Sequence, residues 1–304
     1  MSIDLVVPKE VELSTLLDEL RKLSWASADV LMAYARGSEP PYGFPKSLTV
    51  EEGGDGPVSA ADMAVNELLI SGLKDNLAFK EWDILSEETS KEKTFQQDNY
   101  KKDWCWILDP LDGTKDFLQG SENYAVHIAL AYKKKPKIGI VLIPEKNELW
   151  FGIVGIGAWF ENRDGSKNHF SFSDRLDISK LILVSSKNHQ QSKLNNLLST
   201  LCFGETKKIG SVGCKVASIL RGEADVYISL SGKTSPKDWD MAAPHALIEA
   251  AGGMFSHADG KNLVYQETNY SQSGCLIASH GKSHQKICQK AMDFFSLEEP
   301  KYFV

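Results

Sequence analysis

Near the start of the chain, hydrophobic residues recur every three or four positions, the spacing of one face of an α-helix. They lie at positions 13, 16, 17, 20, 23, 30 and 31. The pattern predicts a helix over residues 10–36, and Gly37 is suited to its end. A second helical pattern covers residues 60–77 and follows Ser59, a residue type that caps helices. Between them, residues 37–57 are rich in glycine and proline and predict a long loop.

The pattern then changes to short apolar runs, which predict β-strands. These runs lie at residues 82–86, 104–108, 125–132, 137–143, 148–154 and 158–162. Only short breaks separate the last four runs, so they predict an antiparallel meander. Residues 89–103, between the first two runs, are polar and predict an exposed excursion.

From about residue 180 onward, predicted strands and helices alternate, which is typical of α/β units. Strands are expected at 181–186, 207–211, 224–230 and 275–279, and helices at 189–203, 213–221, 240–252 and the C-terminal end. The change predicts an N-terminal α+β subdomain with an antiparallel sheet, residues 1–180, and a C-terminal α/β subdomain, residues 181–304.

Composition narrows the class of protein. The 304 residues are 42% hydrophobic and 25% charged, as in globular proteins. A net charge of -7 argues against non-specific binding of nucleic acid. No apolar run approaches the roughly 20 residues that span a bilayer, and the N-terminus lacks a signal-peptide pattern. Five scattered cysteines favour a reducing, cytoplasmic location.

Carboxylates follow two of the predicted strands. Asp109 and Asp112 come after the run WCWIL, and Glu87 comes after WDILS. Carboxylate oxygens without nearby nitrogen or sulfur ligands suit hard cations such as Mg²⁺. Exposed backbone N–H groups around Gly113 and Thr114 could receive an anion. Because Asp and Gly also form ordinary turns, a simple Asp-rich turn stays open as an alternative at this point.

Four motifs together resemble the inositol monophosphatase superfamily of metal-dependent phosphatases. They are PVSAAD at 57–62, LSEE at 85–88, DPLDGTKDF at 109–117 and WDMAAPHALIEAAGG at 239–253. They occur in the order that the family has. The segment IGSVGCKVASILRGEADVYI, residues 209–228, is similar to the branch of bacterial 3'(2'),5'-bisphosphate nucleotidases.

The resemblance implies a five-layer α-β-α-β-α sandwich and a Mg²⁺-dependent phosphomonoesterase with two or three ions per site. The implied reaction removes the 3'-phosphate of adenosine 3',5'-bisphosphate, and of 3'-phosphoadenylyl sulfate as a second substrate, with a metal-activated water. Such a reaction belongs to sulfur metabolism. Inositol monophosphatase or fructose-1,6-bisphosphatase activity on the same metal site is the alternative. The resemblance also implies inhibition by Li⁺ and a monomer or homodimer.

The resemblance assigns roles to the residues of this chain that match the family motifs. The implied metal ligands are Glu87, Asp109, the Leu111 carbonyl, Asp112 and Asp240. The implied catalytic residues, which orient and deprotonate the attacking water, are Asp62 and Thr114. The implied substrate contacts are Asp112, Gly113, Thr114, Ser211, Lys215 and Asp240. His127 is interpreted as a structural residue, and His245 as a packing or surface residue.

One departure and two other functions stay open. The family often has a lysine in the loop before the PVSAAD element, where this chain has Glu51 and Glu52, so loop closure and a third ion are open. A phosphatase with an aspartyl-phosphate intermediate is a second hypothesis, but such enzymes use a D-x-D pair rather than D-x-x-D. A non-enzymatic interaction protein is a third, and the intact set of matched ligands argues against it.

Overall fold

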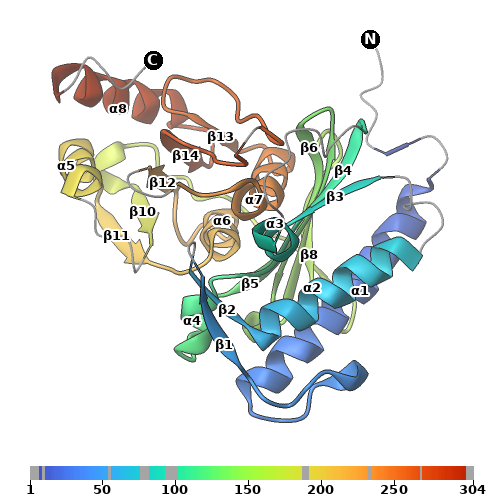
Figure 1. Cartoon of the computed structure of the whole chain (residues 1–304). Helices are drawn as coiled ribbons and strands as arrows, with labels where there is room; N and C mark the ends of the chain where they lie inside the picture. Colours follow the sequence, from blue (N-terminus) through green and yellow to red (C-terminus); the bar gives the residue numbers. More distant parts are fainter. Residues whose placement is uncertain are drawn as a thin grey trace.

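The computed structural model describes residues 7–8, 11–53, 56–75, 82–92, 102–186, 192–231, 235–267 and 269–298. Two β-sheets and the helices around them form a layered α/β sandwich (Figure 1). Most of the predicted excursion at 89–103 and the first residues of the predicted helix at 189–203 lie outside the described residues.

The larger sheet has seven strands in the order β3-β4-β5-β6-β7-β8-β9. Their bounds are β3 Asp83–Ser86, β4 Trp104–Asp112, β5 Ala125–Tyr132, β6 Lys135–Ile143, β7 Glu148–Ile153, β8 Gly157–Glu161 and β9 Lys167–Asn168. β3 runs parallel to β4, and every later neighbour is antiparallel. The predicted meander is therefore confirmed.

The smaller sheet has five strands in the order β11-β10-β12-β14-β13. Their bounds are β10 Ile182–Ser185, β11 Glu205–Lys208, β12 Val226–Leu230, β13 Met254–His257 and β14 Cys275–Ser279. β10 is parallel to both of its neighbours, whereas β14 is antiparallel to β12 and β13. The parallel part carries helices in its crossovers, because parallel neighbours cannot be joined by a tight hairpin.

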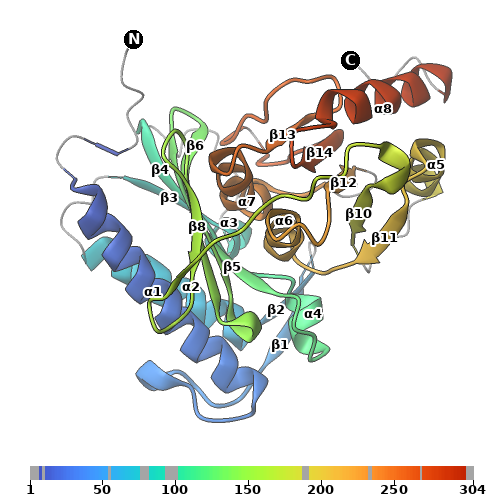
Figure 2. The ribbon, with the colours of Figure 1, turned by 180° about the vertical axis from the view of Figure 1, so that it is seen from behind.

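The helices form three layers around the two sheets (Figures 1 and 2). α1 and α2 cover one face of the larger sheet, α6 and α7 lie between the sheets, and α5 and α8 cover the outer face of the smaller sheet. The helix bounds are α1 Leu13–Ala35, α2 Ala60–Asp75, α3 Glu87–Glu92, α4 Thr114–Leu118, α5 Ser192–Leu201, α6 Val212–Leu220, α7 Asp238–Ala250 and α8 His284–Glu298; the 3₁₀ turns are η1 Pro41–Gly43, η2 Pro144–Lys146 and η3 Ile178–Lys180.

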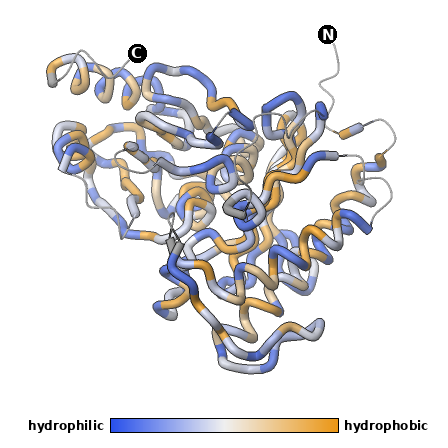
Figure 3. The backbone as a smooth tube through the Cα atoms, viewed as in Figure 1, coloured by the Kyte–Doolittle hydropathy of each residue, from blue (hydrophilic) through white to orange (hydrophobic). Residues whose placement is uncertain are grey.

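Strand β4 shows why its sequence is apolar on both faces. Trp106 and Leu108 pack toward α1 and α2, whereas Cys105 and Ile107 pack toward α6 and α7. Alternate residues of a strand point to opposite faces, so a sheet covered on both sides needs a continuous apolar run. Figure 3 shows this concentration of hydrophobic residues along the strands of the larger sheet.

Two sequence predictions need correction. The predicted loop at 37–57 contains a hairpin, β1 Val50–Gly53 paired with β2 Gly56–Ser59. Val50, Glu51 and Glu52 of β1 are all exposed, so no apolar alternation marks this strand. The strand predicted at 104–108 continues through both aspartates, with an irregular register between Asp109 and Asp112, and the turn follows at Gly113 with φ 97°.

Two further predictions concern the cysteines and membrane-spanning segments. All five cysteines are free thiols, and four of them are buried. Among the described helices, none combines the length and apolar character that crossing a membrane requires. The division into units 1–180 and 181–304 stays a prediction.

Candidate active site

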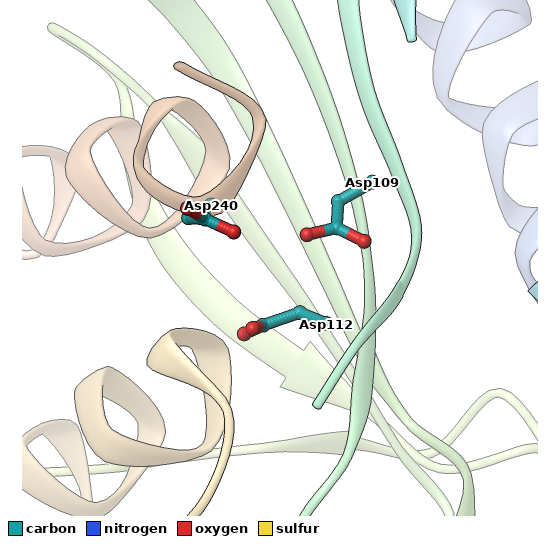
Figure 4. Close-up of side chains that lie close together, drawn as sticks. All are labelled: Asp109, Asp112 and Asp240. Atoms are coloured by element: carbon teal, nitrogen blue, oxygen red, sulfur yellow. The ribbon is translucent and has the colours of Figure 1, made fainter. Parts of the chain in front are cut away.

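Three aspartates from two elements meet at the end of β4 (Figure 4). Asp109 and Asp112 project from β4, and Asp240 projects from the first turn of α7. One carboxylate oxygen of each lies within 4.8 Å of the others. Asp109 is fully buried, Asp112 is 9% exposed and Asp240 is partly buried. The fold thus brings Asp240 next to two acids that precede it by more than a hundred residues in the sequence.

In two of these acids, a protein donor occupies one oxygen only. The Leu111 N–H donates to Oδ1 of Asp109 over 3.0 Å, and the Lys237 N–H donates to Oδ2 of Asp240 over 2.6 Å. Oδ2 of Asp109 is buried and has no hydrogen-bond partner among the described protein groups. A buried carboxylate oxygen without a donor is costly unless a cation satisfies it. The residues present therefore fit a hard divalent cation.

Asp112 is held at the start of α6. Its Oδ2 accepts hydrogen bonds from the Ser211 hydroxyl at 2.6 Å, the Val212 N–H at 2.5 Å and the Gly213 N–H at 3.3 Å. The free N–H groups and positive end of a helix favour an anion at this position. The helix from the second half of the chain thereby orients a carboxylate from the first half.

Glu87 lies at the start of α3, directly after β3, as the sequence predicted for the end of that strand. It is outside the mutual group of three aspartates, but it lies close enough to Asp109 to affect the pKa of that carboxyl. Burial raises the pKa of Asp109 well above its usual range, and the charges of Glu87, Asp112 and Asp240 raise it further. Burial and the charge of Asp112 likewise raise the pKa of Asp240. The cluster therefore resists carrying its full negative charge without a counter-ion.

The two predicted catalytic residues are in direct contact. The Thr114 hydroxyl lies 2.9 Å from Oδ1 of Asp62 and 3.2 Å from the Leu111 carbonyl oxygen. The other carboxylate oxygen of Asp62 accepts hydrogen bonds from the Ser59 N–H and hydroxyl. Burial raises the pKa of Asp62 to about 6, although the hydrogen bonds from Ser59 and Thr114 oppose this shift. Asp62 thus joins α2 to the turn after β4.

Two predicted substrate contacts lie on α6 behind this cluster. The single proton of the Ser211 hydroxyl is committed to Asp112, and the residue has a positive φ of 46°. Lys215 is only 3% exposed, and its ammonium group lies 5.2 Å from the centroid of the Tyr227 ring. Burial lowers the pKa of Lys215, while the charge of Asp112 opposes the shift. Contact of either residue with a substrate stays a prediction.

The contacts of two residues with the site were not predicted from the sequence: Ser59 was expected only to cap a helix, and His127 only to pack. Ser59 and Asp62 have the spacing of a helix capping box, and this signal could have identified Ser59 as the partner of Asp62. His127, interpreted from the sequence as a packing residue, lies with its Nε2 3.2 Å from Oδ2 of Asp112. Nothing local in the sequence signals this contact, because it depends on how β5 pairs with β4. Glu51 and Glu52 are exposed on β1.

The sequence matches the inositol monophosphatase family over residues 13–294. The chain belongs to this family. It is 30% identical over 250 residues to the 3'(2'),5'-bisphosphate nucleotidase CysQ of Salmonella typhimurium, covering 82% of this chain and 94% of that protein. It is 25% identical over 252 residues to the Nus factor SuhB of Pasteurella multocida, covering 80% of this chain and 85% of that protein. The family member described here is therefore a metal-dependent phosphatase.

Solved structures of family members share the fold. An inositol monophosphatase from Thermotoga maritima superposes with a TM-score of 0.73 at 21% identity, covering 94% of this chain and 100% of the other. An IMPase/NADP phosphatase complexed with Mg²⁺ and phosphate superposes with a TM-score of 0.68 at 20% identity, covering 91% of this chain and 93% of the other. The layered sandwich implied by the sequence motifs is confirmed.

Proposed function

We propose that this enzyme removes the 3'-phosphate of adenosine 3',5'-bisphosphate, and of 3'-phosphoadenylyl sulfate as a second substrate. The similarity to CysQ, a 3'(2'),5'-bisphosphate nucleotidase, supports this choice within the family. The resemblance of the GSVGCK segment, residues 210–215, to the nucleotidase branch points to the same substrate class.

One observation carries the assignment of the site. One carboxylate oxygen each of Asp109, Asp112 and Asp240 lies within 4.8 Å of the others, and a buried oxygen of Asp109 has no donor among the residues that the structure describes. In the proposal these three, with Glu87 and the Leu111 carbonyl, hold two Mg²⁺ ions, and a third ion is possible only if the loop with Glu51 and Glu52 contributes. Bound Mg²⁺ supplies positive charge that offsets the charge developing on the phosphoryl group and acidifies water.

The remaining chemistry belongs to the protein. Thr114 donates its only hydroxyl hydrogen in a hydrogen bond to Asp62, so a lone pair of its oxygen is available to accept a hydrogen bond from the attacking water. This hydrogen bond orients the water, and Asp62 takes up the proton that is released. The backbone N–H groups of Gly113 and Thr114, at the start of α4, are proposed to hold the phosphate oxygens. Positioning of this kind is the main protein contribution to phosphoryl transfer.

Product analysis tests this function. The purified protein is incubated with adenosine 3',5'-bisphosphate and Mg²⁺, and nucleotides are separated while inorganic phosphate is measured. We expect one equivalent of phosphate and adenosine 5'-monophosphate as the nucleotide product, with no turnover in excess chelator. Formation of adenosine 3'-monophosphate, or turnover that chelator leaves unchanged, would contradict the proposal.

A second candidate function uses the same ligands. The match to the inositol monophosphatase family favours hydrolysis of an inositol monophosphate as the alternative, with fructose 1,6-bisphosphate as a related substrate. The three acids and Thr114 would act in the same way on these substrates. Only the groups that contact the rest of the substrate, among which we include Lys215, would differ.

A further inference from the structure

A buried histidine lies directly behind the acidic cluster. His127 is on β5, is 0% exposed and faces the side chain of Asp112 on the neighbouring strand. Its Nε2 lies 3.2 Å from Oδ2 of Asp112, within ion-pair distance but poorly aligned for a hydrogen bond. A polar ring with no exposed surface is retained in a core only where it has polar neighbours.

The other ring nitrogen faces the second half of the chain. Nδ1 of His127 lies 3.4 Å from the backbone carbonyl oxygen of Trp239 on α7. Trp239 directly precedes Asp240, and Asp112 stands at the end of β4. One rigid imidazole ring therefore spans the gap between the two elements that carry the aspartates.

Gly213 is shaped to admit this ring. A Cβ atom on Gly213 would lie 2.4 Å from Nε2 of His127 and 2.7 Å from Cγ1 of Val141. The first distance is too short for any real contact, so a side chain at position 213 would displace the ring. The N–H of the same glycine also approaches Oδ2 of Asp112 at 3.3 Å. His127 and Gly213 are thus fitted to each other around one carboxylate oxygen.

We propose that His127 is a positioning residue for the metal site. It acts through Asp112 and the start of α7, and it sets the separation between the Asp112 and Asp240 carboxylates. It also keeps Oδ2 of Asp112 turned toward α6, so that the other oxygen faces the cluster. The proposal rests on the proposed role of these two aspartates as Mg²⁺ ligands. Groups that orient ligands typically change metal affinity by roughly 10–100-fold when they are altered.

Direct binding of Mg²⁺ tests the role, with calorimetry on the chelator-treated full-length protein. His127→Leu replaces the ring with an apolar side chain of similar size and so removes both nitrogens. We expect the dissociation constant of this variant for Mg²⁺ to rise about tenfold or more. His127→Gln can place an amide nitrogen near the Nε2 position, and we expect it to stay within about threefold of the unmodified protein. Equal Mg²⁺ affinity for the unmodified protein and a cooperatively folded His127→Leu would overturn the proposal.

A matched control separates positioning from stability. His284 is another fully enclosed histidine, 2% exposed, on the far side of the smaller sheet. His284→Leu should lower the unfolding temperature without changing Mg²⁺ affinity. In steady-state assays, His127→Leu should raise the Mg²⁺ concentration for half-maximal activity, with kcat at saturating Mg²⁺ nearly retained. If both variants weaken Mg²⁺ binding equally, the effect is general destabilisation and the proposal is wrong.

Gly213→Ala gives an independent arm that leaves His127 in the sequence. We expect it to weaken Mg²⁺ binding by displacing the ring. In a His127→Asn background the side chain is shorter and only the contact with Val141 remains, so the added alanine should weaken Mg²⁺ binding less than it does in the unmodified protein. Fully additive losses would contradict the fitted pair.

The binding experiment also distinguishes this inference from the proposed function. If the unmodified protein itself binds no Mg²⁺, the proposed metal site fails. If it binds Mg²⁺ and hydrolyses the substrate while His127→Leu binds equally well, only the role of His127 fails.

Discussion

The end of β4 and the starts of α6 and α7 contribute different groups to the site: mainly carboxylates from the strand, and mainly hydrogen-bond donors from the helices. The strand supplies Asp109 and Asp112 from one short segment, together with Thr114 just beyond its turn. The helices supply N–H and hydroxyl donors from residues 211–213 and 237, and one further acid, Asp240. The strand end therefore concentrates negative charge, and the helix starts fix the direction in which that charge points.

This difference between the strand end and the helix starts shows that the site depends on the packing between the two sheets. Acids gathered on one strand repel each other and have raised pKa values when they are buried. The helix N-termini offset part of this cost because their free N–H groups favour carboxylates. Neither region forms the site alone, and substitutions in each should have different signatures.

The largest effect is expected at the strand end, from Asp112→Asn. The amide can still accept hydrogen bonds from α6 but loses the charge that we assign to Mg²⁺. We expect Mg²⁺-dependent turnover to fall by about a thousandfold or more, with unfolding in chelator unchanged or shifted to higher temperature because repulsion is relieved. The check is kcat together with thermal unfolding. Full activity in this variant would exclude Asp112 as a ligand.

Thr114→Val should have the next largest effect, because it removes the hydroxyl that contacts Asp62 while keeping the branched shape. A positioned proton-transfer group typically contributes about 10²–10⁴ in rate, so we expect kcat to fall roughly a hundredfold. Mg²⁺ affinity should change little. Thr114→Ser is the matched control, and it should retain most of the activity. Equal losses in both variants would contradict the proposed role, because Thr114→Ser keeps the hydroxyl and should keep the activity with it.

On the helix side, Lys215→Met tests a predicted substrate contact. Loss of a charge-assisted hydrogen bond costs about 1.5–3 kcal/mol, so the KM for adenosine 3',5'-bisphosphate should rise roughly tenfold or more. The KM for inositol 1-phosphate should stay the same. If KM for the bisphosphate is unchanged and Mg²⁺ binds more tightly, Lys215 instead offsets the charge of the neighbouring acids.

The smallest effect concerns stability away from the site. His284 is buried between Ser256 and Ser279, and burial lowers its pKa from 6.5 to about 4, with nearby His280 adding to the shift. In the unfolded chain His284 therefore becomes protonated below about pH 6.5, whereas in the folded protein it stays neutral down to about pH 4. Stability from this group is complete above pH 6.5 and is lost as the pH falls, by at most about 3 kcal/mol.

Urea unfolding of the unmodified protein and of His284→Leu, in chelator between pH 4.5 and 7.5, measures this term. The difference in unfolding free energy should shrink as the pH falls. The exposed His169→Asn variant is the control and should follow the unmodified protein. A difference that is constant with pH would show that His284 titrates alike in both states.

The sequence predicted the strand end better than the helix starts, for a physical reason. Residues 109–114 form one contiguous motif, so their proximity needs no tertiary information. The hydrogen bonds from Ser211 and Val212 to Asp112 depend on how α6 packs between the two sheets. The position of His127 depends on the register between β4 and β5. The β1–β2 hairpin was missed because its first strand is exposed, so hydrophobic patterning does not detect it.

The most direct test of the central claim compares kcat/KM for three substrates under one set of conditions. Adenosine 3',5'-bisphosphate, inositol 1-phosphate and fructose 1,6-bisphosphate are assayed in parallel with saturating Mg²⁺. Our account predicts that the nucleotide exceeds both sugar phosphates by about a hundredfold, equivalent to roughly 2.7 kcal/mol of additional transition-state binding. A larger kcat/KM for either sugar phosphate would contradict the nucleotidase assignment while leaving the phosphatase site in place.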